Sequence, residues 1–374
     1  MKRETMKKGT MRKKIMAGAM ALTMATAMVT TGLAPMENVL VHASTTTNNT
    51  FDTAKELVFN TSMVEELSKS DNVRYYKFTL DEASQLNIGV SSSESHYKYF
   101  TIYDETRTKV YYYEQLSYRE TTGNIYLTGG TYYLKLTANS DIDVTFNVTK
   151  DSLMESFTET QTANNDSIDD ANTISLAKQY KGVLGENDTK DYFKFEVPAT
   201  GAVRVNVKNS ISKTGGNYSA ITSIYDDSNT LLYSKYSNPG DIVDEGVILS
   251  SGTYYLLMTR FNDWGGNKGS YSFKLDYTMS SPTISSLKNS RTKKMTVKWG
   301  KVDGAAGYEL QYTKDKNFKS GVTKKTLKAS AGSASYSKLT KGKTYYVRVR
   351  AYAKVNGKTK YSGWSSKKSV VIKK

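Results

Sequence analysis

The sequence predicts an all-β protein composed of three β-sandwich domains. Short segments in which apolar and polar residues alternate recur along the chain, which is the pattern of half-buried strands. Two long stretches repeat one another, and a third stretch has a different strand pattern and a different charge. The 374 residues, 38% of them hydrophobic and 24% charged, have an ordinary globular composition at a length typical of two or three domains.

Residues 1–43 have the features of a signal peptide. Seven basic residues precede Ile15, and an uncharged stretch from Ile15 to Met36 follows. Val41 and Ala43 fit the two small pockets of a signal peptidase, so we expect cleavage after Ala43. The alternative is a retained membrane anchor, because the apolar stretch is long enough to span a bilayer. We expect a secreted, extracellular protein of a Gram-positive bacterium, without a transmembrane anchor after processing and held at the cell surface by non-covalent contacts.

Reactive side chains are few. Because the chain has no cysteine, disulfides, thiolate metal sites and cysteine nucleophiles are excluded. Of the two histidines, His42 lies in the expected signal peptide, which leaves His96 for any imidazole chemistry. We therefore expect no catalytic residues and no enzyme activity. A glycoside hydrolase needs only paired carboxylates and is the less favoured alternative.

Charge divides the chain. Residues 1–43 contain 7 basic and 2 acidic residues, residues 44–280 contain 21 and 31, and residues 281–374 contain 24 and 3. The net charge of +16 therefore combines an acidic body with a strongly basic C-terminal module. The mature protein is expected to present two surfaces of opposite charge.

An internal repeat organises the acidic part. The pattern of Val73–Leu80 recurs 117 positions later in Lys190–Val197, and that of Leu127–Leu134 recurs 122 positions later in Leu249–Leu256. The second copy therefore has five extra residues, most simply in a loop around 213–217. Two domains of similar size follow from this repeat.

Each repeated block has the period of a strand. In the last block of the first copy, Tyr132, Leu134 and Leu136 alternate with Tyr133 and Lys135, so the first set is expected to face the core and the second to face water. Many short tyrosine-rich strands separated by turns predict a β-sandwich in each copy. Strand packing then explains the 29 tyrosines, with a carbohydrate-stacking surface as the alternative.

The order of these blocks resembles a known family. An opening Asp-x-Ala, a Tyr-Phe-Lys-Phe strand, an Ile-Tyr-Asp strand and a Gly-Thr-Tyr-Tyr-Leu strand are similar to bacterial pre-peptidase C-terminal (PPC) domains, the group that includes the collagen-binding domains of clostridial collagenases. The resemblance implies two jelly-roll-like β-sandwiches, at residues 48–150 and 164–278, joined by a linker at 151–163. It also implies modules that bind or assist rather than catalyse, some of which hold calcium.

A candidate metal site lies in the second copy. Two loops rich in Asn and Asp precede its first strand and its Tyr-Phe-Lys-Phe strand. Calcium prefers about six to eight oxygen ligands, several of them carboxylates, and loops at one end of a sandwich can converge to supply them. Asp166, Asp188 and Asp191 are the expected anionic ligands of a calcium ion, with Asn165 as a carbonyl ligand. The alternative is that these residues only form turns and cap strand edges.

The resemblance also predicts where calcium binding is weak or missing. In calcium-binding relatives two glutamates precede the Asn-Asp pair, and Gln161 and Ala163 stand at those places here, which predicts a site that is weaker or absent. In the first copy the matching residues include Asn48, Asp71 and Arg74. A guanidinium in place of a carboxylate puts positive charge where the cation would lie, so we expect no calcium in the first copy.

The basic module at residues 282–374 has a third strand pattern. Alternating segments that include Trp299, a Tyr-x-Leu-x-Tyr block and a Leu…Gly-x-x-Tyr-x-Val-x-Val-x-Ala block resemble the B, C and F strands of fibronectin type III domains, which are immunoglobulin-like sandwiches. The resemblance implies that Trp299 lies in the core. It also implies that Tyr345 is a tyrosine-corner residue whose hydroxyl bonds to the backbone upstream.

The charge of this module predicts a polyanion partner. A net charge of this size creates a potential of several kT over the surface, and for an exported protein the available polyanions are teichoic acids, acidic polysaccharides and extracellular DNA. Sequence-specific nucleic-acid recognition is not expected, since no reading motif accompanies the charge. The alternative is a solubilising lysine face. The candidate polyanion-binding residues are Lys293, Lys294, Lys324, Lys325, Lys341, Lys343, Lys358, Lys360, Lys367 and Lys368.

These observations favour a secreted, non-catalytic binding protein of the bacterial surface or matrix. The basic fibronectin-like module would hold envelope polyanion, and the PPC-like domains would contact a protein or a glycan. An accessory subunit that targets a separately encoded secreted hydrolase to its substrate is the main alternative, and a carboxylate-dependent glycoside hydrolase is the weaker one.

Overall fold

The computed structural model describes residues 41–42, 47–92, 94, 96–108, 110–116, 119–160, 164–186, 188–214, 216–261 and 266–373. Of the expected signal peptide, only Val41 and His42 belong to the described residues. Gln161 and Ala163, which stand where calcium-binding relatives have glutamates, lie outside the described residues. The regular structure of the described residues consists of strands, which confirms the all-β class. None of these residues belongs to a helix with the length and apolar character needed to cross a membrane.

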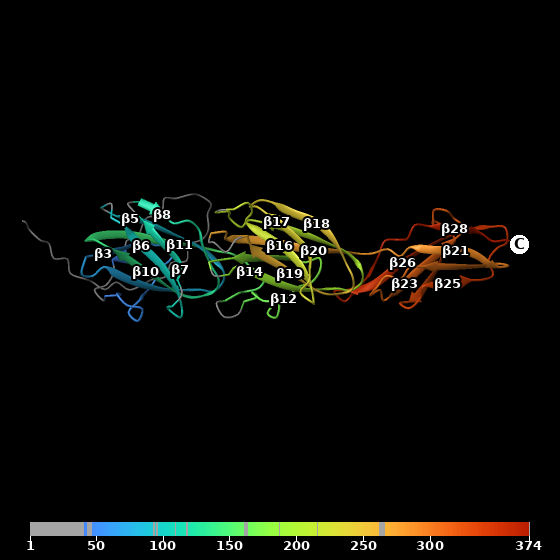
Figure 1. The fold of residues 1–374 in the computed structure, drawn as a ribbon, viewed down its shortest axis with the longest axis horizontal. Coiled ribbons are helices and arrows are strands. Elements are labelled where there is room, and N and C mark those ends of the chain that lie inside the picture. Colours follow the sequence, from blue (N-terminus) through green and yellow to red (C-terminus); the bar gives the residue numbers. More distant parts are fainter. Residues whose placement is uncertain are drawn as a thin grey trace, which may run out of the picture. The chain divides into compact units, whose positions relative to one another are not determined.

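The first sandwich has two sheets that enclose one core (Figure 1). One sheet has the order β1-β3-β11-β5-β8 with β9 paired to β5, and the other has the order β2-β4-β10-β6-β7. Cleavage after Ala43 would remove β1, while β3 would stay paired with β11. The strands are β1 (Val41–His42), β2 (Lys55–Glu56), β3 (Met63–Leu67), β4 (Val73–Leu80), β5 (Ser84–Ser92), β6 (Lys98–Asp104), β7 (Val110–Leu116), β8 (Arg119–Thr121), β9 (Ile125–Leu127), β10 (Gly130–Ala138) and β11 (Ile142–Ser152).

The second sandwich repeats this topology. Its sheets have the orders β12-β14-β19-β16-β17 and β13-β20-β15-β18. Its strands are β12 (Asn172–Thr173), β13 (Gln179–Leu184), β14 (Lys190–Val197), β15 (Gly201–Asn209), β16 (Ala220–Asp226), β17 (Leu231–Ser237), β18 (Ile242–Leu249), β19 (Gly252–Arg260) and β20 (Gly269–Met279). The order β12-β14-β19-β16-β17 matches β2-β4-β10-β6-β7 strand for strand, so the sequence repeat is also a structural repeat.

The extra residues of the second copy fall in one connection. From β4 to β14 and from β5 to β15 the offset is 117 residues, and from β6 to β16 it is 122. The five additional residues therefore lie between Asn209 and Ala220, the connection that contains the predicted loop around 213–217.

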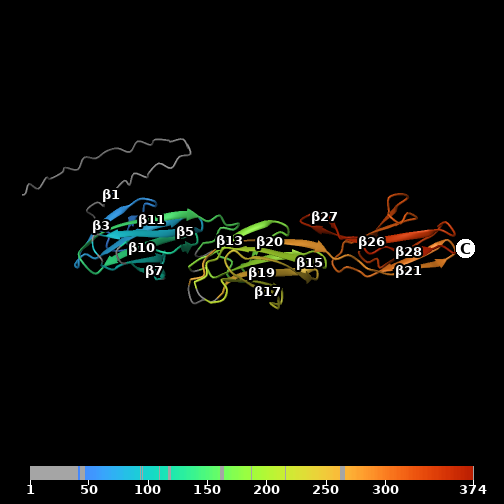
Figure 2. The same ribbon diagram turned by 90° about the horizontal axis from the view of Figure 1, so that it is seen from above.

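The third sandwich has an order typical of immunoglobulin-like folds. One sheet is β21-β22-β25, and the other is β24-β23-β26-β27 with β28 paired to β26 (Figure 2). Its strands are β21 (Ile284–Arg291), β22 (Lys294–Trp299), β23 (Gly307–Thr313), β24 (Thr323–Lys328), β25 (Ser333–Tyr336), β26 (Thr344–Val355), β27 (Lys358–Tyr361) and β28 (Lys368–Val371).

Tyr133 departs from the alternation predicted for its strand. Tyr132, Leu134 and Leu136 are buried as predicted, but Tyr133 is also buried, at 6% exposure. The ring of Phe51 packs edge-on against it, with ring centroids 5.3 Å apart. A residue distant in sequence therefore covers the outer face of β10, and the period of a strand does not reveal such a cover.

The two aromatic residues singled out in the third sandwich occupy the expected positions. Trp299 is buried and packs edge-on against Tyr308. The hydroxyl of Tyr345 accepts a hydrogen bond from the backbone N–H of Thr340 at 3.1 Å and donates to the Thr340 hydroxyl at 3.3 Å. Tyr345 thus forms the predicted tyrosine corner at the start of β26.

Candidate functional site

A cluster of buried carboxylates lies at one end of the second sandwich. Glu159, Asp188 and Asp191 are all buried, and each offers a ligand oxygen that lies within 4.8 Å of the others. Carboxylates that approach this closely away from water repel one another and lose hydration. Their burial therefore calls for a compensating positive charge or for bound protons.

Strand β14 explains the position of Asp191. Side chains alternate along a strand, so Asp191 shares a face with the buried Phe193 and Phe195 and points toward the core. The hydroxyl of Tyr271, on β20, donates a hydrogen bond to Asp191 Oδ2. The second carboxylate oxygen, Oδ1, is buried without a hydrogen-bond partner.

The segment before the second sandwich brings two glutamates to the cluster. The backbone N–H of Ser156 donates to the Lys181 carbonyl at 3.0 Å, and the Lys181 N–H donates to Ser156 Oγ at 2.8 Å. Phe157 stacks on Tyr180 with ring centroids 5.7 Å apart. Burial alternates along this segment, because Glu155, Phe157 and Glu159 are buried or half-buried while Met154, Ser156 and Thr158 are exposed. Anchoring Phe157 on β13 therefore turns Glu155 and Glu159 inward as well.

Asn165 supplies a neutral group with unsatisfied polar atoms. Its backbone carbonyl accepts a hydrogen bond from the Tyr192 N–H at 2.9 Å, which fixes the loop against β14. Its side chain is 1% exposed, and both Oδ1 and Nδ2 lack a hydrogen-bond partner. Buried amide groups are almost always hydrogen-bonded, so this side chain indicates a missing partner in the cluster.

The electrostatics of the cluster match its geometry. Burial, followed by the charge of Glu159, raises the pKa of Glu155 to about 8. Burial also raises the pKa of Glu159 to about 7, with a further contribution from the charge of Asp166. The pKa values of Asp188 and Asp191 lie well above the ordinary aspartate value for the same reasons, burial first and neighbouring carboxylates second.

Cations of the chain lie at the border of the cluster. Lys268 Nζ pairs with Glu186 Oε2 at 2.5 Å. Arg260 donates to the Gly185 carbonyl at 3.0 Å, and its charge lowers the pKa of Asp188 only in part. The acidic groups outnumber these cations, so the cations cannot neutralise the cluster when all of its carboxylates are ionised.

The structure therefore brings together the four residues predicted for the second copy and adds two that were missed. Asn165, Asp188 and Asp191 converge, and Asp166 is close enough for its charge to raise the pKa of Asp188. Glu155 and Glu159 were missed because family spacing pointed to positions 161 and 163. The alternation of Glu155, Phe157 and Glu159 is the sequence signal that could have found them.

The donor set fits a hard divalent cation. Every candidate ligand offers oxygen, several are carboxylates, and calcium prefers such a set. Oxygens of Glu159, Asp188, Asp191 and Asn165 are buried without hydrogen-bond partners. The cavity lined by Glu159, Asp166 and Asp188 measures ≈ 20 Å³, which is room for an ion or a water molecule and not for a sugar ring.

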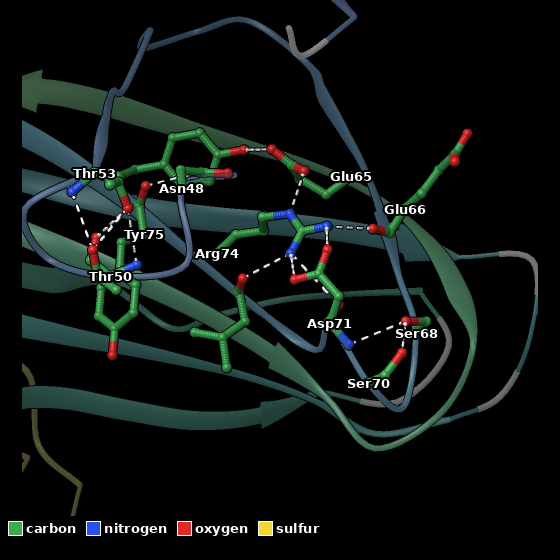
Figure 3. A network of polar contacts seen from close by, with 12 residues as sticks. Asn48, Thr50, Thr53, Glu65, Glu66, Ser68, Ser70, Asp71, Arg74 and Tyr75 are labelled. Atoms are coloured by element: carbon green, nitrogen blue, oxygen red, sulfur yellow. Dashed lines mark hydrogen bonds and ion pairs between the residues drawn. The ribbon is translucent and has the colours of Figure 1, made fainter. Parts of the chain in front are cut away.

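In the first sandwich, the place that matches the carboxylate cluster contains an arginine with acidic partners (Figure 3). Arg74, which matches Asp191 in the repeat, pairs with Glu65 Oε2 at 2.9 Å and with both oxygens of Asp71, at 2.8 and 2.9 Å. Tyr76 donates its hydroxyl to the other oxygen of Glu65. Asn48 also differs from its counterpart Asn165, because its side-chain amide donates to the Tyr75 carbonyl at 2.9 Å. A guanidinium thus supplies the positive charge in the first copy.

The candidate lysines of the third sandwich fall into separate groups. Lys293 and Lys294 lie at the β21–β22 hairpin, and Lys341 and Lys343 lie in the β25–β26 connection at the same end. Lys324 and Lys325 lie on the edge strand β24, whereas Lys358 and Lys360 lie on β27 at the other edge of that sheet. Lys367 and Lys368 lie at the start of β28, where their ammonium groups donate to the carbonyls of Lys316 and Ser285.

Comparison with known proteins identifies this sandwich. Residues 280–368 match the family model described as fibronectin type III domain. The C-terminal module is a fibronectin type III (FN3) domain. This confirms the resemblance carried by Trp299 and Tyr345. A comparison with curated proteins finds no match.

Parts of the chain also match solved structures. The PPC domain of a collagenase from Bacillus anthracis is 21% identical, covering 28% of this chain and 94% of that chain at a TM-score of 0.24. A two-domain FN3 segment of chicken tenascin is 13% identical and covers 46% of this chain and 99% of the tenascin segment, with a TM-score of 0.28. A β-1,2-glucanase from Parabacteroides distasonis is 15% identical and covers 52% of this chain and 30% of the glucanase, with a TM-score of 0.21. The PPC resemblance rests on the residue blocks given above.

Two arginines of the FN3 domain form a ladder with aromatic rings. The guanidinium of Arg348 lies 4.2 Å from the ring centroids of Phe318 and Trp364. That of Arg350 lies 4.5 Å from Trp364 and 3.9 Å from Tyr361. Stacking of this kind stabilises each cation on the sheet surface. These two arginines are held by the domain itself, which leaves lysine as the main source of charge for a partner.

Proposed function

We propose that the protein is a secreted, non-catalytic binding protein whose FN3 domain holds an anionic polymer of the cell envelope. The observation that carries this proposal is the charge of residues 281–374, which contain 24 basic and 3 acidic residues. FN3 domains are typical of extracellular proteins, and a domain of this charge attracts polyanions over a distance set by salt screening. The two acidic sandwiches would then be free to contact an extracellular protein or glycan.

We further propose that the second sandwich binds calcium through the carboxylates of Glu159, Asp188 and Asp191, with Glu155, Asn165 and Asp166 as further oxygen donors. Bound calcium would supply the positive charge that the buried cluster lacks. Because Glu155 and Glu159 belong to the segment before the sandwich, while Asp191 belongs to β14, the ligands themselves hold that segment against the sheet. The role is structural.

A catalytic role for these acids is less well supported. Glycoside hydrolysis requires two carboxylates on either side of a bound sugar. The cavity at Glu159, Asp166 and Asp188 measures ≈ 20 Å³, and the acids are buried. Their arrangement favours an ion over a sugar substrate.

Sedimentation with isolated bacterial cell walls tests the proposed function. At low salt the protein should sediment with intact walls and stay in solution with walls from which the anionic polymers have been extracted. High salt should release it, because screening weakens contacts between exposed charges. Retention that is equal with both kinds of wall and insensitive to salt would rule out polyanion binding.

A further inference from the structure

We propose that the FN3 domain binds a linear phosphate polymer at one end of its sandwich, an inference that rests on the polyanion-binding function proposed above. This end is formed by the β21–β22 hairpin, the β25–β26 connection and the residues after β28. We call it the basic end. It is defined by Lys293, Lys294, Lys338, Lys341, Lys343 and Lys373.

Backbone hydrogen bonds join the three segments of the basic end. The N–H of Leu339 donates to the Lys293 carbonyl at 3.0 Å. The N–H of Gly342 donates to the Ile372 carbonyl at 2.7 Å, and the N–H of Ile372 returns a bond to the Lys343 carbonyl at 3.0 Å. Lysines from distant parts of the sequence therefore lie on one continuous surface.

A single asparagine fixes the hairpin to the last residues of the chain. Asn289 Nδ2 donates to the Lys294 carbonyl at 2.6 Å, and Asn289 Oδ1 accepts the Lys373 N–H at 2.8 Å. Lys294 is half-buried, and the other five lysines of the basic end are exposed. The backbone is thus held in place while the ammonium groups extend into solvent.

The acidic residues of the domain do not neutralise this end. Glu309, on β23, pairs with Arg350 at 2.9 Å. Asp303 lies between β22 and β23, at the opposite end of the sandwich. Asp315 lies near the basic end and stays ionised, because the backbone N–H groups of Asn317 and Lys319, both at 2.8 Å, lower its pKa. Its single negative charge does not offset the six lysines of the basic end.

The neighbouring connection extends the positive surface. Strand β23 pairs with β26 so that Thr313 lies opposite Tyr346, which places the β23–β24 connection at the same end. This connection carries Lys314, Lys316 and Lys319, all exposed. The charge of Lys314 contributes to a lowered pKa of Tyr345, as expected for neighbours. Positive charge therefore gathers at this end from four segments.

The chemistry of the basic end favours a flexible polymer with closely spaced anions. Lysine binds phosphate as a point charge, without the bidentate geometry that arginine offers to a single planar ligand. Each neutralised phosphate of a densely charged polymer releases condensed counterions, so a dense group of lysines gains most from such a polymer. A polysaccharide with widely spaced carboxylates gains less.

Two variants with equal changes in charge test the location. The first replaces lysines of the basic end, as K293Q, K341Q, K343Q and K373Q. The second replaces lysines on the sheet edges, as K324Q, K325Q, K358Q and K360Q. All eight positions are exposed, so both variants are expected to fold, which thermal unfolding checks. Binding of the full chain to long-chain polyphosphate and to a carboxylated polysaccharide is measured over a salt series.

The basic-end variant should bind polyphosphate at least about tenfold more weakly at low salt, with a slope of log Kd against log salt reduced by up to about 3, since each single-strand phosphate contact contributes about 0.7. The edge variant should stay within about twofold of the parent. Equal losses in both variants, or equal affinity of the parent for the carboxylated polymer, would overturn the inference and leave polyanion binding intact. A parent chain that binds neither polymer would overturn the proposed function as well.

Discussion

Asp191 occupies a position whose residue has opposite charge in the two copies of the same fold. In the second sandwich Asp191 is 1% exposed among other carboxylates, and in the first sandwich Arg74 stands at the matching place and pairs with Asp71. Exchange of a carboxylate for a guanidinium reverses the charge of the site. At the residue scale, this exchange is the reason why calcium is proposed for the second sandwich and not for the first.

Replacing Asp188 or Asp191 by asparagine should weaken calcium binding by about 100-fold, because loss of one buried charged partner costs about 3 kcal/mol. The same changes should raise the melting temperature in the presence of a chelator, because they remove a buried negative charge from the cluster. Calorimetric titration with calcium and thermal unfolding measure the two effects. Asp169→Asn, at an exposed position, is the matched control. Calcium affinity equal to that of the parent in both cluster variants would contradict the assignment of these residues as calcium ligands.

Replacing Arg74 by methionine should destabilise the first sandwich by about 3 kcal/mol, because it leaves the buried Glu65 without its cation. Arg107→Met is the control, since Arg107 pairs with an exposed Asp52 and such a pair contributes about 1 kcal/mol or less. Denaturant unfolding compares the two. Equal losses would contradict the assignment of a buried ion pair to Arg74.

At the scale of elements, the carboxylate cluster joins a linking segment to the sheet. The burial of the acids raises the pKa of Glu159 to about 7 and that of Glu155 to about 8, above the ordinary value of 4.5. Acids of this kind favour the folded state when protonated, so the folded protein binds more protons than the unfolded chain over this range. Their contribution to stability is complete below about pH 4.5 and is lost as the pH rises through about 7 to 8.

The second sandwich should therefore lose thermal stability between about pH 4.5 and pH 8 when calcium is removed by a chelator. With saturating calcium the trend should reverse, because the ion binds the deprotonated ligands and its binding releases protons. Melting curves over a pH series with chelator and with calcium measure both trends. Parallel curves in the two conditions would show that calcium has no part in this cluster.

Tyrosine corners tie a strand to the connection before it. Tyr345→Phe removes the hydrogen bonds between the hydroxyl and Thr340 at the start of β26, which should destabilise the FN3 domain by about 1 kcal/mol. Unfolding by denaturant measures this loss. Tyr346→Phe, at the next and less buried position of the same strand, is the control and should change the stability little. A larger loss of stability in the control would contradict the role of the Tyr345 hydroxyl in a tyrosine corner.

The strand segments, the repeat and the position of the inserted residues could all be predicted, because each leaves a local pattern of period two or a fixed offset. Residues that depend on a distant partner could not. Tyr133 is covered by Phe51, and Glu155 and Glu159 reach the cluster only because Phe157 is anchored on β13. Lys293 and Lys341 lie at the same end of the FN3 domain because their connections do. This could not be predicted without knowing how the strands of the sandwich are ordered.

At the scale of the whole molecule, opposite charges are separated into different domains. Residues 44–280 contain more acidic than basic residues, and residues 281–374 contain few acids. A uniformly basic chain would attach to polyanions along its whole length. With this separation, the polyanion binding proposed for the FN3 domain would leave the acidic sandwiches repelled from the same polymer and available for other partners.

The most direct test of this account is the affinity of the protein for purified cell walls over a series of salt concentrations. Attachment through the lysines of the FN3 domain predicts that log Kd rises linearly with log salt, with a slope of several units that reports the number of neutralised phosphates. Affinity that stays constant across the series would contradict the central claim, because contacts of apolar or hydrogen-bonding groups would then be responsible for retention.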